Sequence, residues 1–271
     1  MATSKTTICG VIGNPILHSL SPLIHQNFAK QIKLDLDYQK YLLEQEQLET
    51  FVRDFFRNGG TGLNVTLPFK QSVLSLVDEL SDAASVCQAV NTLSINNNGT
   101  IQGDTTDGAG LILDLKRLHF EFENKHLLVV GAGGASISVI HELLKNHSKV
   151  TLHNRNQEKI STIIKQLSGI GKVDSFSEKK NVKFDGLICA ISQFNQALLE
   201  AVVSHLHDNA FIYDLNYAER AKATLDYFKQ KGFVKSSDGY GMLVGQAAKS
   251  FEIWHGVLPK LENFNTSPIE V

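Results

Sequence analysis

The sequence has few cysteines. Cys9, Cys87 and Cys189 are the only ones among its 271 residues. Because they are odd in number and far apart, they indicate neither a disulfide framework nor a zinc site, and they suit a reducing cytoplasm. The histidine pairs also lack a third ligand at a useful spacing, so we expect no bound metal.

Long apolar and long basic runs are missing as well. No stretch reaches the ~18 consecutive apolar residues of a membrane span, and the N-terminus is not typical of a signal peptide. The net charge is −2, with no basic run that could follow a nucleic-acid backbone. We therefore expect a cytoplasmic protein, a monomer or homodimer, whose partner is a small-molecule substrate and neither nucleic acid nor a membrane.

The composition is that of a globular protein. Apolar residues make up 42% and charged residues 20%, and 271 residues suffice for one large or two medium domains. Strands alternating with helices predict an α/β fold with a doubly wound parallel sheet and ligands at the carboxyl ends of its strands. In the second half we expect a strand at 186–191, a helix at 196–206 and a last short strand at 233–235.

A strand–turn–helix–strand pattern stands in the middle of the chain. It consists of an apolar run at 127–130, glycines at 131, 133 and 134, helical spacing of apolar residues at 139–144, and a second apolar run at 150–153. Backbone amides at such a turn, with the positive end of the helix, can hold a pyrophosphate. The third small residue of the usual fingerprint is Ser136 here, and the alternative is an ordinary tight turn.

The end of the second strand indicates which dinucleotide would bind. An NAD site usually has an acidic residue about 20 residues after the first glycine, but here Asn154, Arg155 and Asn156 stand there, with Arg155 24 positions after Gly131. A guanidinium matches a 2′-phosphate in charge and geometry, whereas a carboxylate would repel it. We therefore predict NADP, the alternative for Arg155 being a solvated surface side chain.

Several polar residues have both a structural and a functional interpretation. Ser21 before Pro22 is typical of a helix N-cap, yet Ser19 adds a second hydroxyl that would make a carboxylate pocket at the same helix end. Lys70 follows a short strand, where a lysine is usually solvated. Asp107 stands where a helix begins and could simply cap it.

Taken together, these segments resemble the shikimate dehydrogenase family over nearly the whole chain. No single motif is decisive, but their order and spacing are very specific. The motifs are GNP at 13–15, HS at 18–19, SP at 21–22, NVTLPFK at 64–70, AVNTL at 89–93, TDG at 106–108, GAGGAS at 131–136, GML at 241–243 and QAA at 246–248.

The resemblance implies reversible NADP-dependent reduction of 3-dehydroshikimate to shikimate, a step of aromatic amino-acid (chorismate) biosynthesis. It implies a catalytic pair, Lys70 and Asp107. The implied substrate contacts are Ser19 and Ser21 at the carboxylate, with Tyr217, and Asn64, Thr66, Asn91, Asp107 and Gln246 at the ring hydroxyls. The implied cofactor contacts are Gly131, Ala132, Gly133, Gly134, Ala135, Asn154, Arg155, Asn156, Gly239 and Met242.

It also implies a discontinuous first domain. Residues 1–105 and 240–271 would form an α/β substrate-binding and catalytic domain, with the C-terminal helix packing back on it. Residues 106–239 would form a Rossmann-like NADP-binding domain with a doubly wound parallel sheet.

The sequence departs from the family pattern on the cofactor side. Thr105 stands where asparagine is frequent, Ile137 where arginine is common, and the loop 189–194 reads CAISQF in place of a pattern like NATSxG. Two alternatives therefore stay open. One is a quinate/shikimate dehydrogenase using NAD, and the other a non-catalytic shikimate-binding sensor, although a pure binder would have no evident need for both Lys70 and Asp107.

Overall fold

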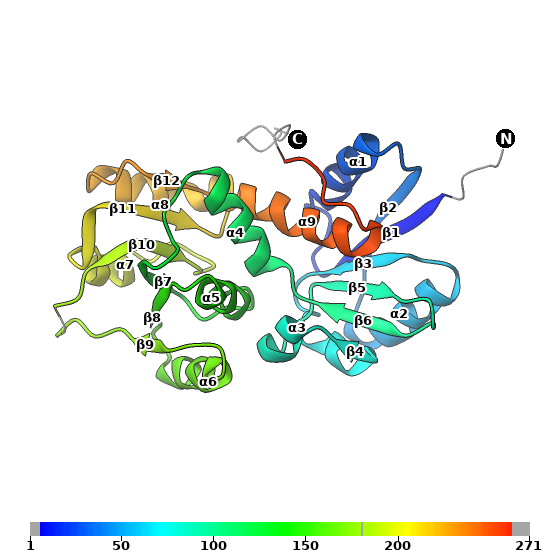
Figure 1. Ribbon diagram of the computed structural model, residues 1–271, viewed down its shortest axis with the longest axis horizontal. Coiled ribbons are helices and arrows are strands. Elements are labelled where there is room, and N and C mark those ends of the chain that lie inside the picture. Colours follow the sequence, from blue (N-terminus) through cyan, green and yellow to red (C-terminus); the bar gives the residue numbers. More distant parts are fainter. Residues whose placement is uncertain (1–5, 180, 262–271) are drawn as a thin grey trace. The chain divides into compact units, whose positions relative to one another are not determined.

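The structure, a computed structural model, describes residues 6–179 and 181–261 (Figure 1). Its residues form two compact units. Within the described ranges, unit 1 takes residues 6–106 and 246–261, and unit 2 takes residues 107–245 apart from residue 180. Each unit has its own sheet, which has six strands among the described residues.

Unit 1 begins with alternating strands and helices and continues with a β-hairpin. Its strands are β1 (Thr7–Gly13), β2 (Leu36–Leu42), β3 (Gly62–Val65), β4 (Glu79–Leu80), β5 (Thr92–Ile95) and β6 (Ile101–Asp104). Its helices are α1 (Ser21–Gln31), α2 (Leu48–Arg57) and α3 (Asp82–Cys87), with 3₁₀ turns η1 (Gln45–Gln47) and η2 (Ser72–Leu76).

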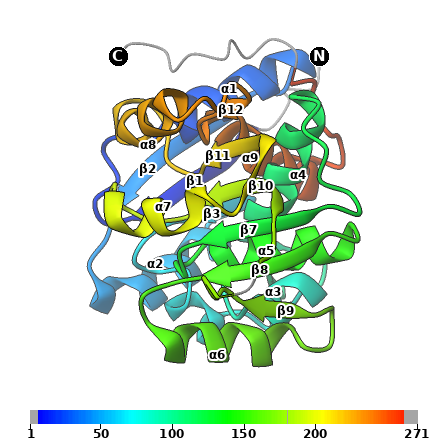
Figure 2. The ribbon, with the colours of Figure 1, turned by 90° about the vertical axis from the view of Figure 1, so that its left-hand side faces the viewer.

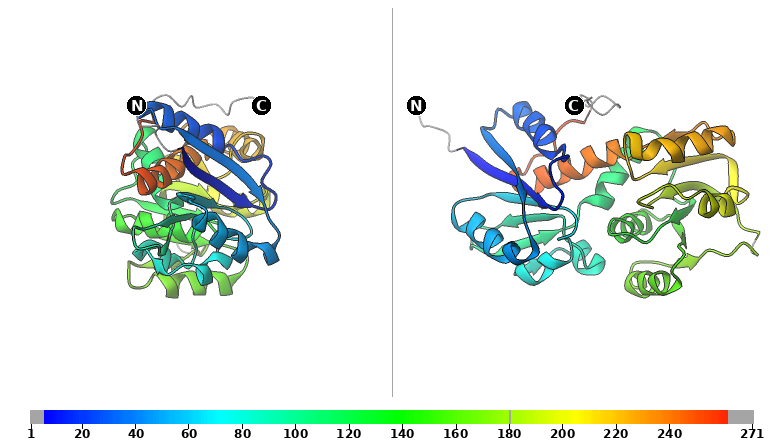
Figure 3. Two further views of the ribbon diagram at one scale, coloured as in Figure 1. Left: turned by 90° about the vertical axis from the view of Figure 1, so that its right-hand side faces the viewer. Right: turned by 180° about the vertical axis from the view of Figure 1, so that it is seen from behind.

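The sheet of unit 1 is mixed, in the order β2-β1-β3-β5-β6-β4. Strands β1 and β2, in blue, run side by side in parallel (Figure 3). Strand β1 is buried on both faces: Ile12 packs in the cluster that includes Val52 of α2, and Cys9 and Val11 pack on the other face. Such a strand reads as a continuous apolar run, which is why its position can be predicted.

Helix α9 (Tyr240–His255) supplies its later residues to unit 1. Trp254 lies against Gly62 of β3, where an added Cβ would come within 2.2 Å of the indole. The indole nitrogen of Trp254 donates a hydrogen bond to the carbonyl of Leu93 at 3.0 Å. The expected return of the C-terminal helix to the first part of the chain is therefore confirmed.

Unit 2 alternates strands and helices except between β9 and β10, which no helix among the described residues separates (Figure 2). Its strands are β7 (His126–Val130), β8 (Lys149–His153), β9 (Val173–Ser175), β10 (Phe184–Cys189), β11 (Leu206–Asp214) and β12 (Ser236–Ser237). Its helices are α4 (Asp107–Arg117), α5 (Ser136–Lys145), α6 (Gln157–Leu167), α7 (Gln196–Val203), α8 (Glu219–Gln230) and the start of α9.

All strand pairs in this sheet are parallel, in the order β12-β11-β10-β7-β8-β9. The chain runs outward from β7 to β9 and then returns to build the other half from β10 to β12. Because such crossovers are right-handed, the connecting helices of the two halves cover opposite faces, and α7 and α8 share one core with β10 and β11. The predicted doubly wound parallel sheet is thus confirmed, and its topological switch point lies between β7 and β10.

Three expected elements of unit 2 are displaced. The strand expected at 186–191 is Phe184–Cys189, and the helix expected at 196–206 ends at Val203, because Leu206 already begins β11. The strand expected at 233–235 is wrong. Phe233 is buried against Phe228 of α8, with ring centroids 5.7 Å apart, and it is the polar pair Ser236–Ser237 that joins β11. No helix among the described residues is long and apolar enough to cross a bilayer.

Candidate active site

The polar residues predicted in the first part of the chain gather at one edge of the unit 1 sheet. Strand β3 ends at this edge, and the loop after it carries Thr66 and Lys70. Strand β5 is antiparallel to β3, so Asn91, just before β5, lies at the same edge. Strand β6 is antiparallel to β5, so its end brings Thr106 there too. The hairpin therefore brings together residues that are far apart in sequence.

The two serines meet at the start of α1. The hydroxyl of Ser19 donates to that of Ser21 at 3.1 Å, and the backbone N–H of Ser21 donates back to the Ser19 oxygen at 3.3 Å. The N-cap interpretation of Ser21 is wrong by one position, because Leu20 is the N-cap and makes no side-chain cap hydrogen bond. Two neighbouring hydroxyls at the positive end of a helix suit a carboxylate.

Asn64 is held on both sides of its amide. Its carbonyl oxygen accepts a hydrogen bond from the hydroxyl of Tyr38 at 2.7 Å. Its amide nitrogen donates to the hydroxyl of Ser250 at 2.9 Å and to the carbonyl of Asn91 at 3.3 Å. Burial raises the pKa of Tyr38 well above its usual value, so its hydroxyl stays a donor and fixes the orientation of the Asn64 amide.

The side-chain amide of Asn91 is also held by hydrogen bonds at both its oxygen and its nitrogen. Its side-chain oxygen accepts from the backbone N–H of Thr106 at 2.9 Å and from the hydroxyl of Thr92 at 2.9 Å. Its amide nitrogen donates to the Thr106 hydroxyl at 3.0 Å and reaches Gln246 of α9 at 3.5 Å. Asn64, Asn91 and Gln246 thus belong to one buried network of amides and hydroxyls.

Four members of this network were missed by the sequence analysis as site residues: Tyr38, Thr92, Thr106 and Ser250. Ser250 is fully buried on α9, and its hydroxyl lies 2.7 Å from that of Thr92 and 3.3 Å from that of Thr106. The sequence offers no clear signal for Ser250, because Lys249 and Glu252 stand beside it in the helix and its partners lie up to 186 positions away.

A histidine lies next to this network. His25 of α1 is fully buried, stacked on Tyr38 with ring centroids 4.5 Å apart, and 5.1 Å from the indole ring of Trp254. Neither of its ring nitrogens makes a hydrogen bond of standard geometry in the described part of the chain, although Asn64 lies near enough to favour the charged ring. Burial, with charge repulsion from His255, lowers the pKa of His25 to about 3, so the ring is neutral at physiological pH.

Lys70 and Asp107 belong to different units. Lys70 is half-buried in the turn before η2, and its carbonyl accepts from the N–H of Val90 at 2.8 Å. Asp107 is the first residue of α4 in unit 2. Their meeting as a catalytic pair stays a prediction.

Tyr217 also belongs to unit 2, where it follows β11. Burial raises the pKa of its phenol, so the hydroxyl remains a donor at neutral pH. Its contact with the substrate carboxylate likewise stays a prediction.

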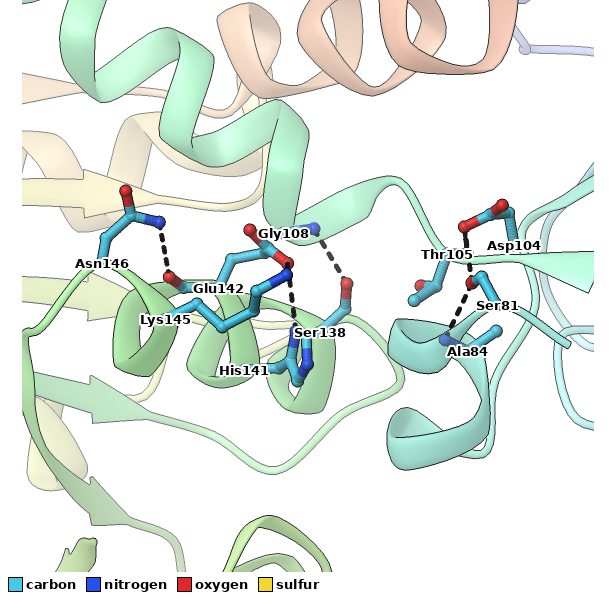
Figure 4. A network of polar contacts seen from close by, with 10 residues as sticks. All are labelled: Ser81, Ala84, Asp104, Thr105, Gly108, Ser138, His141, Glu142, Lys145 and Asn146. Atoms are coloured by element: carbon cyan, nitrogen blue, oxygen red, sulfur yellow. Dashed lines mark hydrogen bonds and ion pairs between the residues drawn. The ribbon is translucent and has the colours of Figure 1, made fainter. Parts of the chain in front are cut away.

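The segments on either side of Asp107 are fixed within their own units (Figure 4). In unit 2 the N–H of Gly108 donates to the hydroxyl of Ser138 at 2.9 Å, which ties the first turn of α4 to α5. In unit 1 the hydroxyl of Ser81 donates to the carboxylate of Asp104 at 2.7 Å and also accepts from the N–H of Ala84, which caps α3. Hydrogen bonds therefore hold the chain on both sides of Asp107.

The glycine turn of unit 2 fits a pyrophosphate. Gly131 has a φ of +113°, and a Cβ there would come within 2.5 Å of the Ala190 carbonyl across the switch point. An added Cβ at Gly134 would meet nothing within 4 Å, and one at Gly133 would meet only that carbonyl, at 3.6 Å. The first glycine is thus required by the turn, and the other two leave open space where a ligand can approach the backbone.

The start of α5 supports the same conclusion. Its N-cap is Ala135, which offers no side-chain cap hydrogen bond, and the positive end of the helix dipole lies at the glycine turn, where it favours an anion. Within the turn the N–H of Ser136 donates to the carbonyl of Gly133 at 3.0 Å, and the N–H of Gly133 donates to the hydroxyl of Ser136 at 3.0 Å. The serine at the third fingerprint position therefore holds the turn from inside, which a glycine or alanine could not do. Ala132 lies in the same turn.

The turn after β8 leaves its arginine exposed. Asn156 caps α6, its side-chain oxygen accepting from the N–H of Lys159 at 3.1 Å, and Asn154 donates to the carbonyl of Asn156 at 3.1 Å. Arg155 is exposed and has no ion pair with any described residue. Both asparagine side chains thus shape the turn, and the guanidinium is left for a ligand or for water.

The first turn of α9 is pinned inside unit 2. The N–H of Met242 donates to the hydroxyl of Tyr213 at 3.1 Å, and Tyr213 donates to the buried carboxylate of Asp114 at 2.7 Å. Gly239 packs so closely on the end of β11 that a Cβ would come within 2.3 Å of the Leu215 carbonyl. Gly239 and Met242 therefore lie at the carboxyl edge of the sheet. Among the described residues, no group of three His, Cys, Asp or Glu could hold a metal.

Unit 2 is doubly wound and has an open glycine turn, and unit 1 of the same chain has a sheet edge lined by amides and hydroxyls. This combination defines a dinucleotide-dependent oxidoreductase of two domains. The chain matches the families described as shikimate dehydrogenase substrate binding domain over residues 11–93, shikimate/quinate 5-dehydrogenase over 114–217 and shikimate 5'-dehydrogenase C-terminal domain over 239–264. A relative from Shewanella woodyi, named shikimate dehydrogenase (NADP(+)), is 41% identical over 254 residues, which cover 93% of each chain. The chain belongs to the shikimate dehydrogenase family.

Solved structures show the same fold. The shikimate dehydrogenase of Aquifex aeolicus is 31% identical, with a TM-score of 0.82 over 96% of each chain. The shikimate 5-dehydrogenase of Listeria monocytogenes, in complex with shikimate and NAD, is 25% identical, with a TM-score of 0.84 over 95% of this chain and 94% of that one.

Proposed function

We propose that the protein catalyses the reversible NADP-dependent reduction of 3-dehydroshikimate to shikimate, in the biosynthesis of aromatic amino acids. The observation that carries the proposal is the buried network around Asn64, Asn91 and Gln246 in unit 1. Its amides and hydroxyls match a small ring with several hydroxyl groups, and the pocket of Ser19 and Ser21 matches a carboxylate on that ring. Family membership supports the same reaction.

The substrate contacts follow from these residues. Ser19, Ser21 and Tyr217 would bind the carboxylate, and Asn64, Thr66, Asn91 and Gln246 would bind ring hydroxyls. Because Tyr38 and Ser250 already orient the amide of Asn64, little conformational entropy would be lost on binding. Unit 1 would thus be the substrate-binding domain and unit 2 the dinucleotide-binding domain.

Lys70 and Asp107 would manage the proton. When bound, the nicotinamide supplies or accepts the hydride. Reduction of the ketone also needs one proton for the developing alkoxide, which the Lys70 ammonium would donate, and oxidation of shikimate returns that proton to the Lys70 amine. The Asp107 carboxylate would orient the ammonium and the reacting hydroxyl.

The dinucleotide would be held along the carboxyl edge of the unit 2 sheet. Residues 131–135 would bind the pyrophosphate, and Arg155 the 2′-phosphate, with Asn154 and Asn156 shaping its turn. Gly239 and Met242 would bind the nicotinamide end. The Shewanella woodyi relative carries NADP(+) in its name.

The test is absorbance at 340 nm with shikimate or quinate against NADP or NAD. We expect the highest kcat/KM with shikimate and NADP, and Lys70→Ala should lower kcat by about 10²–10⁴, the usual contribution of an acid–base group. Lys116→Ala, which removes an exposed lysine in unit 2, is the control. A fall of less than tenfold would remove Lys70 from this role.

Each alternative predicts a different result in the same assay. Comparable turnover of quinate, or activity with NAD alone, would favour the quinate/shikimate dehydrogenase. No turnover with any pair, despite shikimate binding measured by calorimetry, would favour the sensor. We place the enzyme in the cytoplasm, since its three buried free cysteines suit a reducing compartment, and assign it as a monomer or homodimer.

A further inference from the structure

Three loops at the carboxyl edge of the unit 2 sheet are joined at one residue, Asn216. Its amide nitrogen donates to the carbonyl of Ile191, in the loop after β10, at 2.8 Å. Its own carbonyl accepts from the N–H of Gly239, just before α9, at 2.7 Å. The loop after β11 is thereby hydrogen-bonded to the loop after β10 and to the residue just before α9.

Asp214, the last residue of β11, fixes the orientation of Asn216. One carboxylate oxygen accepts both the backbone N–H of Asn216, at 2.9 Å, and its side-chain amide, at 2.8 Å. The carboxylate is fully buried, and its other oxygen makes no hydrogen bond of standard geometry with a described residue, although the hydroxyl of Thr224 lies near enough to stabilise its charge. A buried, half-satisfied carboxylate is expensive to maintain, so it points to a functional reason.

The joined loops border the part of the site that the nicotinamide would reach. Arg155 after β8 marks the adenosine side and the glycine turn after β7 the pyrophosphate, so the rest of the dinucleotide extends over β10 and β11. The carbonyl of Ala190, next to Ile191, also lies against Gly131 of that turn. A displacement of Ile191 would therefore change the backbone position of both the glycine turn and Gly239.

We propose that Asp214 is a positioning residue for the dinucleotide, acting through Asn216 on the Ile191 and Gly239 loops. The proposal rests on the proposed function, since it assigns a role toward the same cofactor. It also explains how a loop reading CAISQF at 189–194 keeps a defined shape, because the contact to Ile191 uses its backbone carbonyl and does not depend on its side chain.

The charge state of Asp214 gives the proposal a pH signature. Burial raises the pKa of this carboxyl to about 6, against contacts from Asn216 and the Thr224 hydroxyl that lower it, and the neighbouring Asp238 raises it further. The other groups facing it are the buried thiol of Cys189 on β10 and the hydroxyl of Thr224 on α8. As pH falls through 6, the carboxyl takes up a proton, its acceptor weakens, and the hold on Asn216 loosens.

The experiment compares Asp214→Asn with the wild type in NADPH binding, measured by fluorescence titration without substrate. We expect the Kd for NADPH to rise at least fivefold at pH 7.5, while the KM for shikimate changes less than twofold. Asp208→Asn, an exposed aspartate on the same strand, is the matched control and should leave both unchanged. A Kd within twofold of the wild type would overturn the proposal.

The pH series separates a positioning role from a general loss of stability. Between pH 7.5 and 5 the wild-type Kd should rise more than that of Asp214→Asn, which has no carboxyl to protonate. Because the 2′-phosphate of NADPH itself titrates near pH 6 with every variant, only the difference between the wild type and Asp214→Asn reports on Asp214, and Asp208→Asn should follow the wild type. Identical curves for the wild type and Asp214→Asn would refute the role.

Two further measurements test the proposal even if Asp214→Asn folds poorly or the proposed function is wrong. Asn216→Ala should give the same defect in Kd, and the double variant should not add to it, because both act through one contact. Amide hydrogen exchange of residues 189–195, measured without ligand, should be faster in both variants. This readout tests the link from Asp214 to Ile191 even if the wild type turns over no substrate, and unchanged exchange in both would overturn it.

Discussion

We expect the preference for NADP over NAD to depend on one exposed side chain, that of Arg155. Its guanidinium has no ion pair with described residues, and the two asparagines that flank it are used within the turn. Arg155→Ala should raise the KM for NADP by roughly 10- to 100-fold, since a charge-assisted hydrogen bond contributes about 1.5–3 kcal/mol. The KM for NAD, which has no 2′-phosphate, should stay within about twofold.

The control for Arg155 is Lys165→Ala, which removes an exposed cation from the helix that follows the same turn. General electrostatic attraction of the dinucleotide would raise the KM equally in both variants. Equal effects of Arg155→Ala on NADP and NAD would leave the arginine as a solvated surface residue, and the 2′-phosphate contact would have to be sought elsewhere.

At the residue scale, the sequence predicts which side chains would carry the chemistry but not which residues hold them in place. Asn64 and Asn91 could be predicted from their motifs. Tyr38 and Ser250, which orient the amide of Asn64, could not, because a single tyrosine in a strand and a single serine in a helix have many ordinary interpretations. Only the fold brings Ser250 within 2.9 Å of a side chain 186 positions away.

At the scale of elements, the contact between α4 and α5 depends on Gly108. A Cβ there would lie 2.0 Å from the carbonyl oxygen of Ser138 and 2.7 Å from the Cγ of Glu142. Gly108→Ala should therefore separate the two helices and destabilise the protein by about 1–3 kcal/mol, as overpacking does. Differential scanning calorimetry should show a fall in Tm of roughly 2–10 °C for a protein of this size.

Gly169→Ala is the matched control, because a Cβ at that position meets nothing within 4 Å. Its Tm should stay within about 1 °C of the wild type, since an exposed substitution of this kind changes stability by no more than about 0.5 kcal/mol. If both variants melted alike, close packing of α4 on α5 would not be what Gly108 provides.

Elements were predictable where their periodicity was strong and their ends were marked by glycine. Strand β7, the glycine turn and α5 lie where the pattern predicts them, because a buried parallel strand is a continuous apolar run. The predicted strand at 233–235 failed because Phe233 fills the core beside α8, whereas the residues paired with β11 are Ser236 and Ser237, and Lys235 contributes only its carbonyl, which accepts from the N–H of Ile212 at 2.8 Å. The buried residue and the residues paired in the sheet are therefore different ones. An apolar sequence pattern predicts only which residue is buried.

At the scale of the whole molecule, two buried groups, one in each unit, should change the stability in opposite directions with pH. The pKa of His25 in unit 1 is lowered to about 3, so the unfolded chain binds more protons below pH 6.5, and stability is lost as pH falls from there. The pKa of Asp214 in unit 2 is raised to about 6, so the folded state binds more protons, and stability is lost as pH rises from about 4 to 6.

His25→Phe tests the histidine part of this balance. At pH 5 the buried neutral ring should cost about 2 kcal/mol of stability relative to pH 7, from 1.36 kcal/mol per pH unit. The variant should lose less of its urea midpoint between pH 7 and 5 than the wild type, whereas the exposed His119→Asn should behave as the wild type does. Equal slopes in all three would mean that His25 is not the group that acid protonates.

The division of the chain also sets an order on folding during synthesis. Unit 2 is continuous from Asp107 to Gly245, whereas unit 1 contains Ser250 and Trp254, which cover β3 and β5 from a helix near the end of the chain. While this helix is still inside the ribosome, the indole of Trp254 cannot pack on Gly62. The hydroxyl of Ser250 likewise cannot reach that of Thr92. The part of the protein that is translated first is therefore the last to be completed.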